Sequence, residues 1–451
     1  MGLGMSIALI VLAAGKGTRM QSDLPKVLHK IAHAPMLWHA LRAGQTLEPD
    51  HCVVVAGHEA ALVEASAKDY DPEIQVVLQT EQLGTGHAVS QAKDALAGFE
   101  GDAIVLYGDT PFIRQDTLEA MAAARETHDV VVLGFEAADP GRYGRLVTDG
   151  DALLEIVEFK DATEAQRAIT LCNSGVVAAK SEVLFDLLSA VSNDNAAGEY
   201  YLTDIVGIAR ARGLSATVVR CDESETLGVN SRAELASAET LLQQRKRQDL
   251  LEDGVAMQAP ETVYLAWDTV IGRDTEIEPN VVFGPDVTVE SGARIRAFSH
   301  LEGAHVSRGA VVGPYARLRP GAELAEDTRV GNFVEIKNAT LGEGAKVNHL
   351  TYIGDAEIGE RSNIGAGTVT CNYDGFFKHR TVIGSDAFIG SDTMLVAPVT
   401  IGDGAMTGSG STITKDVPAG ALALGRARQD NKLGFATKLF DMLRSKKAQK
   451  K

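Results

Sequence analysis

A histidine at position 349 lies within the segment VNHLTYIGDAEIG, residues 347–359, where apolar residues and glycine recur. An imidazole titrates near neutral pH, so it can take up or release a proton during a reaction. Arg319 and Lys337 lie in the same part of the chain, and paired cations of this kind bind phosphate or carboxylate. These residue types suggest proton transfer on an anionic substrate, provided that the fold brings them together.

The element that could bring them together is a six-residue repeat. From Ile271 to Ile401, apolar residues fall at every sixth position, with a few steps of five and one longer break between Ile364 and Ile383. A hexapeptide period is typical of a parallel β-helix, in which three hexads close one triangular coil around the apolar residues. The break contains the segment VTCNYDGFFKHRT, and an excursion from a rigid coil is where function is often placed.

This coil predicts a cluster of polar side chains on one outer face. Residues three hexads apart stack at the strand spacing of about 4.8 Å, which places Arg319 beside Lys337 and Glu335 beside Tyr352, with His349 on the adjoining turn. Stacked cations repel unless an anion lies between them. The face is therefore a candidate anion site; the alternative is an ordinary polar exterior.

Residues 5 to about 230 lack the repeat. Apolar runs such as IALIVLA, CVVVA, IQVVL, AIVLY and VVVLGF alternate with helical patterns such as QDTLEAMAAARET, which predicts a parallel α/β sheet. Ligands of such sheets bind at the carboxyl ends of the strands. Two segments should meet there, LAAGKGTRM at residues 12–20 and LYGDTP at residues 106–111.

These two segments could hold a phosphate group and a metal ion. Backbone N–H groups around Gly15 and Gly17 can cradle phosphate, with Arg19 and Lys26 as counter-charges. Asp109 follows a strand, where its carboxylate suits Mg²⁺. The loop fits neither the P-loop nor the dinucleotide-binding motif.

A polar helix should separate the two halves. We expect it over residues 231–249, with Ser231 as its N-cap and Gly254 at its end. The expected parts are residues 1–230, a linking arm at 231–254, and the coil at 255–451 with a basic tail.

Composition excludes several classes of partner. A formal charge of -18 argues against nucleic acid and anionic membranes, and no apolar run is long enough for a membrane helix. The cysteines, Cys52, Cys172, Cys221 and Cys371, form no disulfide framework, which suits the cytoplasm. IALIVLAAG lacks a preceding basic residue, so it is not expected to be a secretion signal, and the myristoylation pattern from Gly2 to Ser6 is interpreted as coincidence.

Longer motifs point to one family. RLRPGAEL, GNFVEIK, HLTYIGDAEIG and NIGAGTVTCNYDG, together with LAAGKGTRM and LPKVLH, closely resemble the bacterial bifunctional N-acetylglucosamine-1-phosphate uridyltransferase and glucosamine-1-phosphate N-acetyltransferase family. The resemblance covers nearly the whole chain. It implies a Rossmann-like, mostly parallel α/β nucleotidyltransferase domain, followed by a left-handed parallel β-helix, in the biosynthesis of UDP-N-acetylglucosamine.

The resemblance also implies residue roles in the first half. UTP would contact the loop residues Leu12, Ala13, Ala14, Gly15, Arg19 and Lys26, and its base would be read by Gln79, Gly84 and Thr85. N-acetylglucosamine 1-phosphate would contact Tyr107, Gly108, Gly144, Glu158 and Asn173. Asp109 with Asn230 would hold Mg²⁺.

In the second half the resemblance implies that His349 is the general base, with Glu335 as its orienting partner. Arg319, Lys337, Tyr352 and Asn363 would hold glucosamine 1-phosphate. The family is a homotrimer that shares this site between neighbours. Acetyl-CoA would lie along Ala366, Asn372, Tyr373, Ser391, Ser409 and Arg426.

Two alternatives compete with this hypothesis. One is an ADP-glucose or mannose-1-phosphate type of pyrophosphorylase, whose coil serves only assembly or regulation. The other is a coil that serves only trimerisation and binding. Neither predicts turnover of acetyl-CoA, whereas HLTY and CNYDG favour it.

Overall fold

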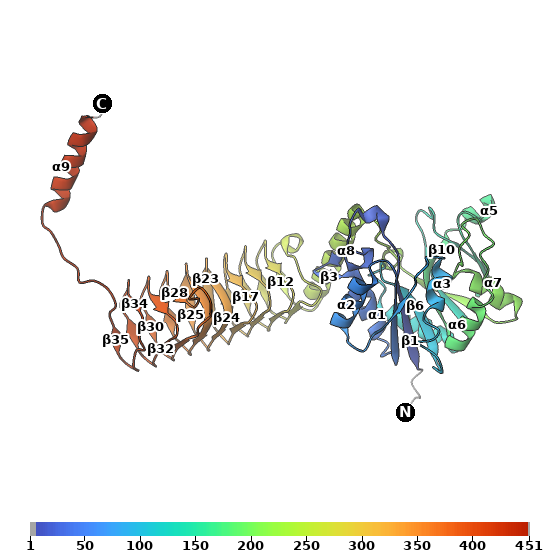
Figure 1. Cartoon of the computed structure of the whole chain (residues 1–451), viewed down its shortest axis with the longest axis horizontal. Helices are drawn as coiled ribbons and strands as arrows, with labels where there is room; N and C mark the ends of the chain where they lie inside the picture. The colour runs from blue at the N-terminus through green and yellow to red at the C-terminus, as the bar shows by residue number, and fades with distance from the viewer. Residues whose placement is uncertain (1–5, 450–451) are drawn as a thin grey trace. The chain divides into compact units, whose positions relative to one another are not determined.

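The computed structural model describes residues 6–449, so Gly2 of the myristoylation pattern lies outside them. The chain divides into two compact units between Lys246 and Arg247. Figure 1 shows an α/β unit in the first and a ladder of short strands in the second.

The described residues of the first unit form a nine-stranded sheet in the order β5-β4-β1-β6-β10-β7-β11-β9-β8. β1, β4, β5 and β6 are mutually parallel, as is the pair β7 and β11. β10 runs antiparallel to both β6 and β7, so the sheet is mixed beyond β6. The strands are β1 Ile7–Ala13, β4 His51–Ala56, β5 Gln75–Leu78, β6 Asp102–Tyr107, β7 Val130–Glu136, β8 Arg145–Asp149, β9 Ala152–Val157, β10 Leu171–Lys180 and β11 Ala216–Cys221.

Helices cover both faces of this sheet. Alternate residues of β1 enter two cores: Leu9 packs with residues of α1, α2 and α4, and Ile10 with residues of α3, α6 and α7. Burial on both faces explains why β1 is apolar without alternation. The helices are α1 Met36–Gln45, α2 Ala60–Tyr70, α3 Thr85–Ser90, α4 Gln115–Arg125, α5 Glu164–Arg167, α6 Ser181–Leu188 and α7 Asp204–Ala211.

The expected polar helix is α8, Arg232–Glu252. Ser231 caps it, since its Oγ accepts a hydrogen bond from the Glu234 backbone N at 3.2 Å. Leu235, Leu241 and Leu242 pack against a small core of the first unit. The unit boundary falls inside this helix.

The second unit is the expected coil. Its strands run from β12, Ala256–Met257, to β35, Leu422–Ala423, and pair in parallel from coil to coil. Every apolar residue of the ladder is buried, and Leu318, Ile336 and Ile353 are register partners. The strands that carry the candidate site are β21 Arg317–Leu318, β23 Arg329–Asn332, β24 Glu335–Leu341, β25 Lys346–His349, β26 Tyr352–Ile358, β27 Asn363–Ile364 and β28 Val369–Cys371.

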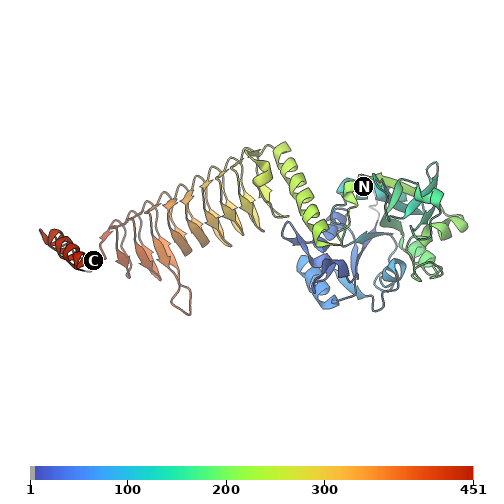
Figure 2. The ribbon, with the colours of Figure 1, turned by 90° about the horizontal axis from the view of Figure 1, so that it is seen from above.

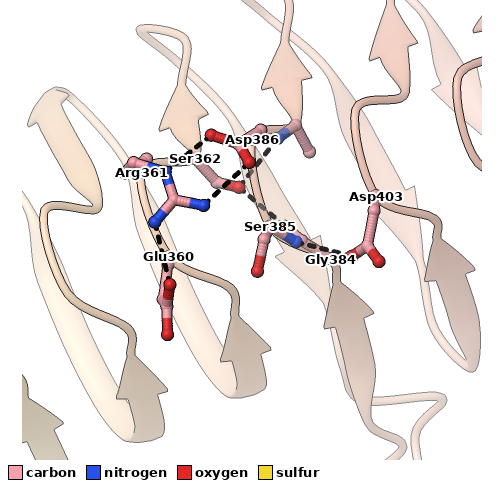
Figure 3. Close-up of polar contacts among 8 residues, drawn as sticks. Glu360, Arg361, Ser362, Gly384, Ser385, Asp386 and Asp403 are labelled. Atoms are coloured by element: carbon pink, nitrogen blue, oxygen red, sulfur yellow. Dashed lines mark hydrogen bonds and ion pairs between the residues drawn. The ribbon is translucent and has the colours of Figure 1, made fainter.

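Polar side chains connect successive coils at the corners. Figure 3 shows one corner, where the Arg361 guanidinium pairs with Asp386 through Nε at 2.8 Å and Nη2 at 2.9 Å. Both side chains are exposed, and exposed ion pairs add little stability. The apolar ladder therefore dominates the stability of the coil.

One loop leaves the coil between β28 and β29, Thr381–Ile383, and projects outward in Figure 2. Asp374 organises it by accepting hydrogen bonds from the backbone N of Phe376 and Phe377, at 2.8 and 2.7 Å. His379 Nε2 lies 2.7 Å from the same carboxylate. We call residues 372–380 the excursion loop.

The last described helix is α9, Phe435–Ala448, which is exposed throughout. No helix among the described residues is long and apolar enough to cross a membrane.

Candidate active sites

A cavity of about 250 Å³ lies at the carboxyl ends of β1 and β6. The backbone N of Gly108 donates to Leu12 O at 2.9 Å and so joins the two segments that the sequence placed at this edge. The cavity is lined by Leu12, Ala13, Ala14, Gly15, Lys26, Val27, Gln79, Gln82, Gly84, Thr85, Ala88, Tyr107, Asp109 and Glu199.

Lys26 connects the two residues expected to hold a metal ion. Its Nζ donates a hydrogen bond to Asn230 Oδ1 at 2.9 Å and forms an ion pair with Asp109. A carboxylate oxygen and an amide oxygen therefore converge on one cationic centre. Asp109 follows β6 and Asn230 immediately precedes the N-cap of α8, so the fold brings them together from distant segments.

Gln79 lies deep in the cavity. Its side chain is 4% exposed, and its Nε2 donates to Gly84 O at 3.1 Å. Gly84 has φ +112°, and a Cβ there would lie 2.6 Å from Tyr200 O. A glycine is required at this turn, which holds a buried amide beside the cavity.

Tyr107 lines the cavity and lies near Glu158, one of the expected sugar-phosphate residues. Burial raises the pKa of Tyr107 above its ordinary value, and the nearby Asp109 and Glu158 charges raise it further. The phenol therefore stays protonated and can donate a hydrogen bond. Burial also raises the pKa of Glu158, whose Oε1 accepts a hydrogen bond from Thr203 Oγ1 at 3.2 Å.

Gly144 and Asn173 lie next to Glu158. The backbone N of Asn173 donates to Gly144 O at 2.9 Å. A Cβ on Gly144 would lie 3.5 Å from Glu158 Oε1 and 3.6 Å from the Asn173 Cβ. These three expected sugar-phosphate residues therefore form one group.

Other residues of this unit differ from expectation. Arg19 is exposed and does not line the cavity. Gln82 and Glu199 do line it, but the sequence analysis did not select them. Neither belongs to a motif of known spacing, so only the packed structure reveals them.

The coil places Arg319 beside Lys337, as the repeat predicts. Arg319 N donates to Ile336 O at 2.9 Å, which sets its position next to Lys337. Lys378 of the excursion loop contacts Lys337 and lowers its pKa, and Arg319 lowers that pKa further. Three cations thus crowd one face, and the sequence analysis missed Lys378 because the loop breaks the repeat.

His349 has a different partner from the one expected. Its Nδ1 lies 2.9 Å from Asn332 Oδ1, whereas Glu335 forms an ion pair with Arg319 Nη1 at 2.8 Å. The expected role of Glu335 as the orienting partner of His349 is therefore wrong in this structure. The reason is register: Asn332 is the pairing partner of His349 across β23 and β25, and Glu335 is the partner of Tyr352.

The Asn332 contact fixes the histidine tautomer. An amide oxygen only accepts hydrogen bonds, so in the neutral imidazole Nδ1 carries the proton and Nε2 keeps a free lone pair.

If His349 is the base of acetyl transfer, we expect Asn332→Ala to lower the kcat of that reaction by about tenfold or more. The KM for glucosamine 1-phosphate should change little. Asn332→Asp keeps an accepting oxygen and should retain more activity, and steady-state rates of both variants check this. Equal losses in the two variants would contradict the tautomer argument.

The remaining acetyl-site candidates form two groups. Asn363 pairs in register with Lys346, at the far end of β25 from His349. Asn372 and Tyr373 begin the excursion loop, where Asn372 Nδ2 donates to the Asp355 carboxylate. One corner carries Ala366, Ser391, Ser409 and Arg426, linked by Asp392 N to Ala366 O at 2.7 Å, Gly410 N to Ser391 O at 2.8 Å and Arg426 Nη1 to Ser409 O at 2.9 Å.

Comparison with known proteins gives consistent matches along the chain. Residues 9–257 match the MobA-like NTP transferase domain, and residues 268–303 and 380–415 match the bacterial transferase hexapeptide repeats. The chain is 69% identical to "Bifunctional protein GlmU" of Ruegeria sp. (strain TM1040), covering 99% of both chains. It is 70% identical to the protein of the same name from Ruegeria pomeroyi over 99% of both chains, and 66% identical to that of Jannaschia sp. over 97% of both.

Proposed function

The chain belongs to the GlmU family of bifunctional proteins, and from this premise we propose which residues carry its two activities. The enzyme acetylates glucosamine 1-phosphate with acetyl-CoA and transfers UMP from UTP to N-acetylglucosamine 1-phosphate, releasing pyrophosphate. Its full-length match argues against a pyrophosphorylase whose coil serves only assembly, and against a coil that only binds.

The acetyl-transfer proposal is supported above all by the crowding of Arg319, Lys337 and Lys378 on one face of the coil. Glu335 pairs with Arg319, and Asp355 lies near Lys337 and Lys378. Three cations gathered at one place still suit a bound phosphate. The sugar amine then needs a base, because an ammonium cannot attack a thioester. His349 Nε2 takes the amine proton, the amine nitrogen attacks the thioester carbonyl, and CoA leaves as its thiolate. Tyr352 and Asn363 are assigned to the sugar.

We assign acetyl-CoA to the corner of Ala366, Ser391, Ser409 and Arg426 and to the start of the excursion loop, Asn372 and Tyr373. Ser391, Ser409 and Arg426 of this corner are exposed, which suits a long, extended cosubstrate.

Lys378→Met should raise the KM for glucosamine 1-phosphate by about tenfold, the size of one lost charge-assisted hydrogen bond. The KM for acetyl-CoA should change much less, since Lys378 is assigned to the phosphate. Thiol release at varied concentrations of each substrate measures both values. Lys415→Met, on another exposed part of the coil, is the matched control, and equal KM values in the two variants would argue against a phosphate contact.

In the first unit we propose that Asp109 and Asn230 hold Mg²⁺. Their oxygens already converge on the Lys26 ammonium, and oxygen donors suit this ion. When bound, the ion neutralises phosphate charge during the transfer. Lys26, released from these two side chains, meets the phosphates of UTP, together with Arg19 and the Leu12–Gly15 backbone.

The other cavity residues orient the two substrates. Gln79, Gly84 and Thr85 read the uracil, and Tyr107 with Gly144, Glu158 and Asn173 holds the sugar phosphate. The sugar phosphate oxygen attacks the α-phosphorus of UTP in line while pyrophosphate leaves, so no protein nucleophile is needed.

We also propose a homotrimer. Phe298, Tyr315 and Phe333 stack along an exposed corner, with ring centroids 4.9 and 5.3 Å apart, and this corner continues through Leu350 beside His349. An exposed aromatic stack of this kind suits a contact between copies. Light scattering of the full chain should give three times the chain mass, and a monomer at micromolar concentration would contradict the assembly.

The described cysteines are free, which supports a cytoplasmic location.

A further inference from the structure

Arg145 is a fully buried guanidinium, with only 1% of its surface exposed. All its hydrogen-bond partners are backbone carbonyls. Nη1 donates to Tyr143 O and to Pro140 O at 3.3 Å, and Nη2 donates to Gly141 O at 3.1 Å and to Arg167 O at 3.3 Å. Nε also donates to Arg167 O, at 3.3 Å. Within residues 6–449, no carboxylate forms an ion pair with it.

Such a group is costly, because a buried charge without a counter-ion loses its hydration. Arg125, the comparable buried arginine of this unit, is 5% exposed and pairs with Asp102 at 2.9 Å. What Arg145 offers instead is a rigid fork of donors that satisfies the carbonyls of a tight loop, residues 140–143, and of a second segment at Arg167. Lysine carries the same charge but lacks this fork.

The first segment held by Arg145 leads directly into the sugar-phosphate group. Residues 140–143 end at Gly144, whose carbonyl accepts the Asn173 backbone N–H at 2.9 Å. A Cβ on Gly144 would be in van der Waals contact with both Glu158 and Asn173, so a shift of this loop would change the distance from Gly144 to these two residues.

The second segment, at Arg167, is connected to Glu158 of the same sugar-phosphate group through Phe159. The Arg167 guanidinium lies over the Phe159 ring at 4.6 Å and donates to Phe159 O at 3.1 Å through Nη2. Phe159 follows Glu158 in the chain. Arg145 therefore ties together the two segments that position Gly144 and Glu158.

We infer that Arg145 is a positioning residue for uridylyl transfer, which sets the spacing between Gly144 and Glu158 and thereby the fit of the sugar phosphate. This inference rests on the proposed role of Gly144, Glu158 and Asn173. Arg145 itself contacts no substrate in this account.

The test compares Arg145→Lys and Arg145→Ala with Arg125→Lys and Arg125→Ala. The Arg125 variants also remove a buried guanidinium, but at the amino end of β6, away from Asp109. In the Arg145 variants we expect the KM for N-acetylglucosamine 1-phosphate to rise by about tenfold, with the KM for UTP changed less than about twofold. In the Arg125 variants both KM values should stay near wild type, even where melting temperature falls.

A second measurement keeps the inference testable if a variant is unstable. Added guanidinium at low millimolar concentration should restore part of the lost kcat/KM in Arg145→Ala by filling the vacated space, and should do nothing for Arg125→Ala. If Arg145→Ala does not fold, the KM of the folded Arg145→Lys variant for N-acetylglucosamine 1-phosphate tests the inference on its own. Unchanged KM for the sugar phosphate in a folded Arg145 variant, with Asn173→Ala raising it, overturns the role of Arg145. If Asn173→Ala also leaves this KM unchanged, the proposed sugar-phosphate group fails, and the inference with it.

Discussion

Replacing His349 by alanine should lower the kcat of acetyl transfer by about 10²- to 10⁴-fold, the usual contribution of a general base. The amine of glucosamine 1-phosphate is largely an ammonium near neutral pH, so it must lose a proton before it can attack. Phosphate binding depends on the cations, so the KM for the sugar phosphate should change little. Thiol release from acetyl-CoA, followed as a function of pH, measures the loss.

His305→Ala is the matched control for this prediction. His305 is another histidine of the coil, and it lies between Glu290, at 3.0 Å, and Glu323, at 3.7 Å, rather than beside Asn332. Its loss should leave acetyl transfer and uridylyl transfer near wild-type rates. A His349→Ala protein with the full rate of acetyl transfer would remove the base from the mechanism.

Asp109→Ala should abolish uridylyl transfer to the limit of detection, a loss on the order of 10³-fold or more in kcat. The substitution removes a carboxylate from the proposed Mg²⁺ site and leaves Lys26 without its ion-pair partner in the cavity. Acetyl transfer should be retained, because every residue assigned to it lies in the coil. Pyrophosphate release at increasing Mg²⁺ concentration measures the effect, and chelation of the wild-type protein should reproduce it.

Asp116→Ala provides the control, because Asp116 is an exposed carboxylate at the start of α4. It should leave both activities unchanged. If Asp109→Ala lost both activities while remaining folded, the two centres could not be independent.

The sequence predicted the features that follow from periodicity. A six-residue repeat fixes which side chain stacks on which, so the positions of Arg319, Lys337, Glu335 and Tyr352 could be stated from spacing alone. The loops after β1 and β6 were likewise placed by the rule that parallel strands present their carboxyl ends at one edge.

The features that were missed or wrong depend on local geometry rather than on period. Lys378 reaches the site from the excursion loop, whose path no repeat determines. Asn332, not Glu335, contacts His349 because the chain turns a corner at Phe333, which has a positive φ of 55°. The antiparallel β10 in the sheet of the first unit was also missed, since the runs LCNSGVVAAK and ATVVRC carry no mark of strand direction.

The central claim is that the coil assembles Arg319, Lys337, Lys378 and His349 into one acetyl-transfer site. A crystal structure of the full-length protein with glucosamine 1-phosphate tests it most directly. We predict the phosphate within hydrogen-bonding distance of all three cations, and the sugar amine facing His349 Nε2. A phosphate bound elsewhere on the coil, or an amine turned away from His349, would contradict the account.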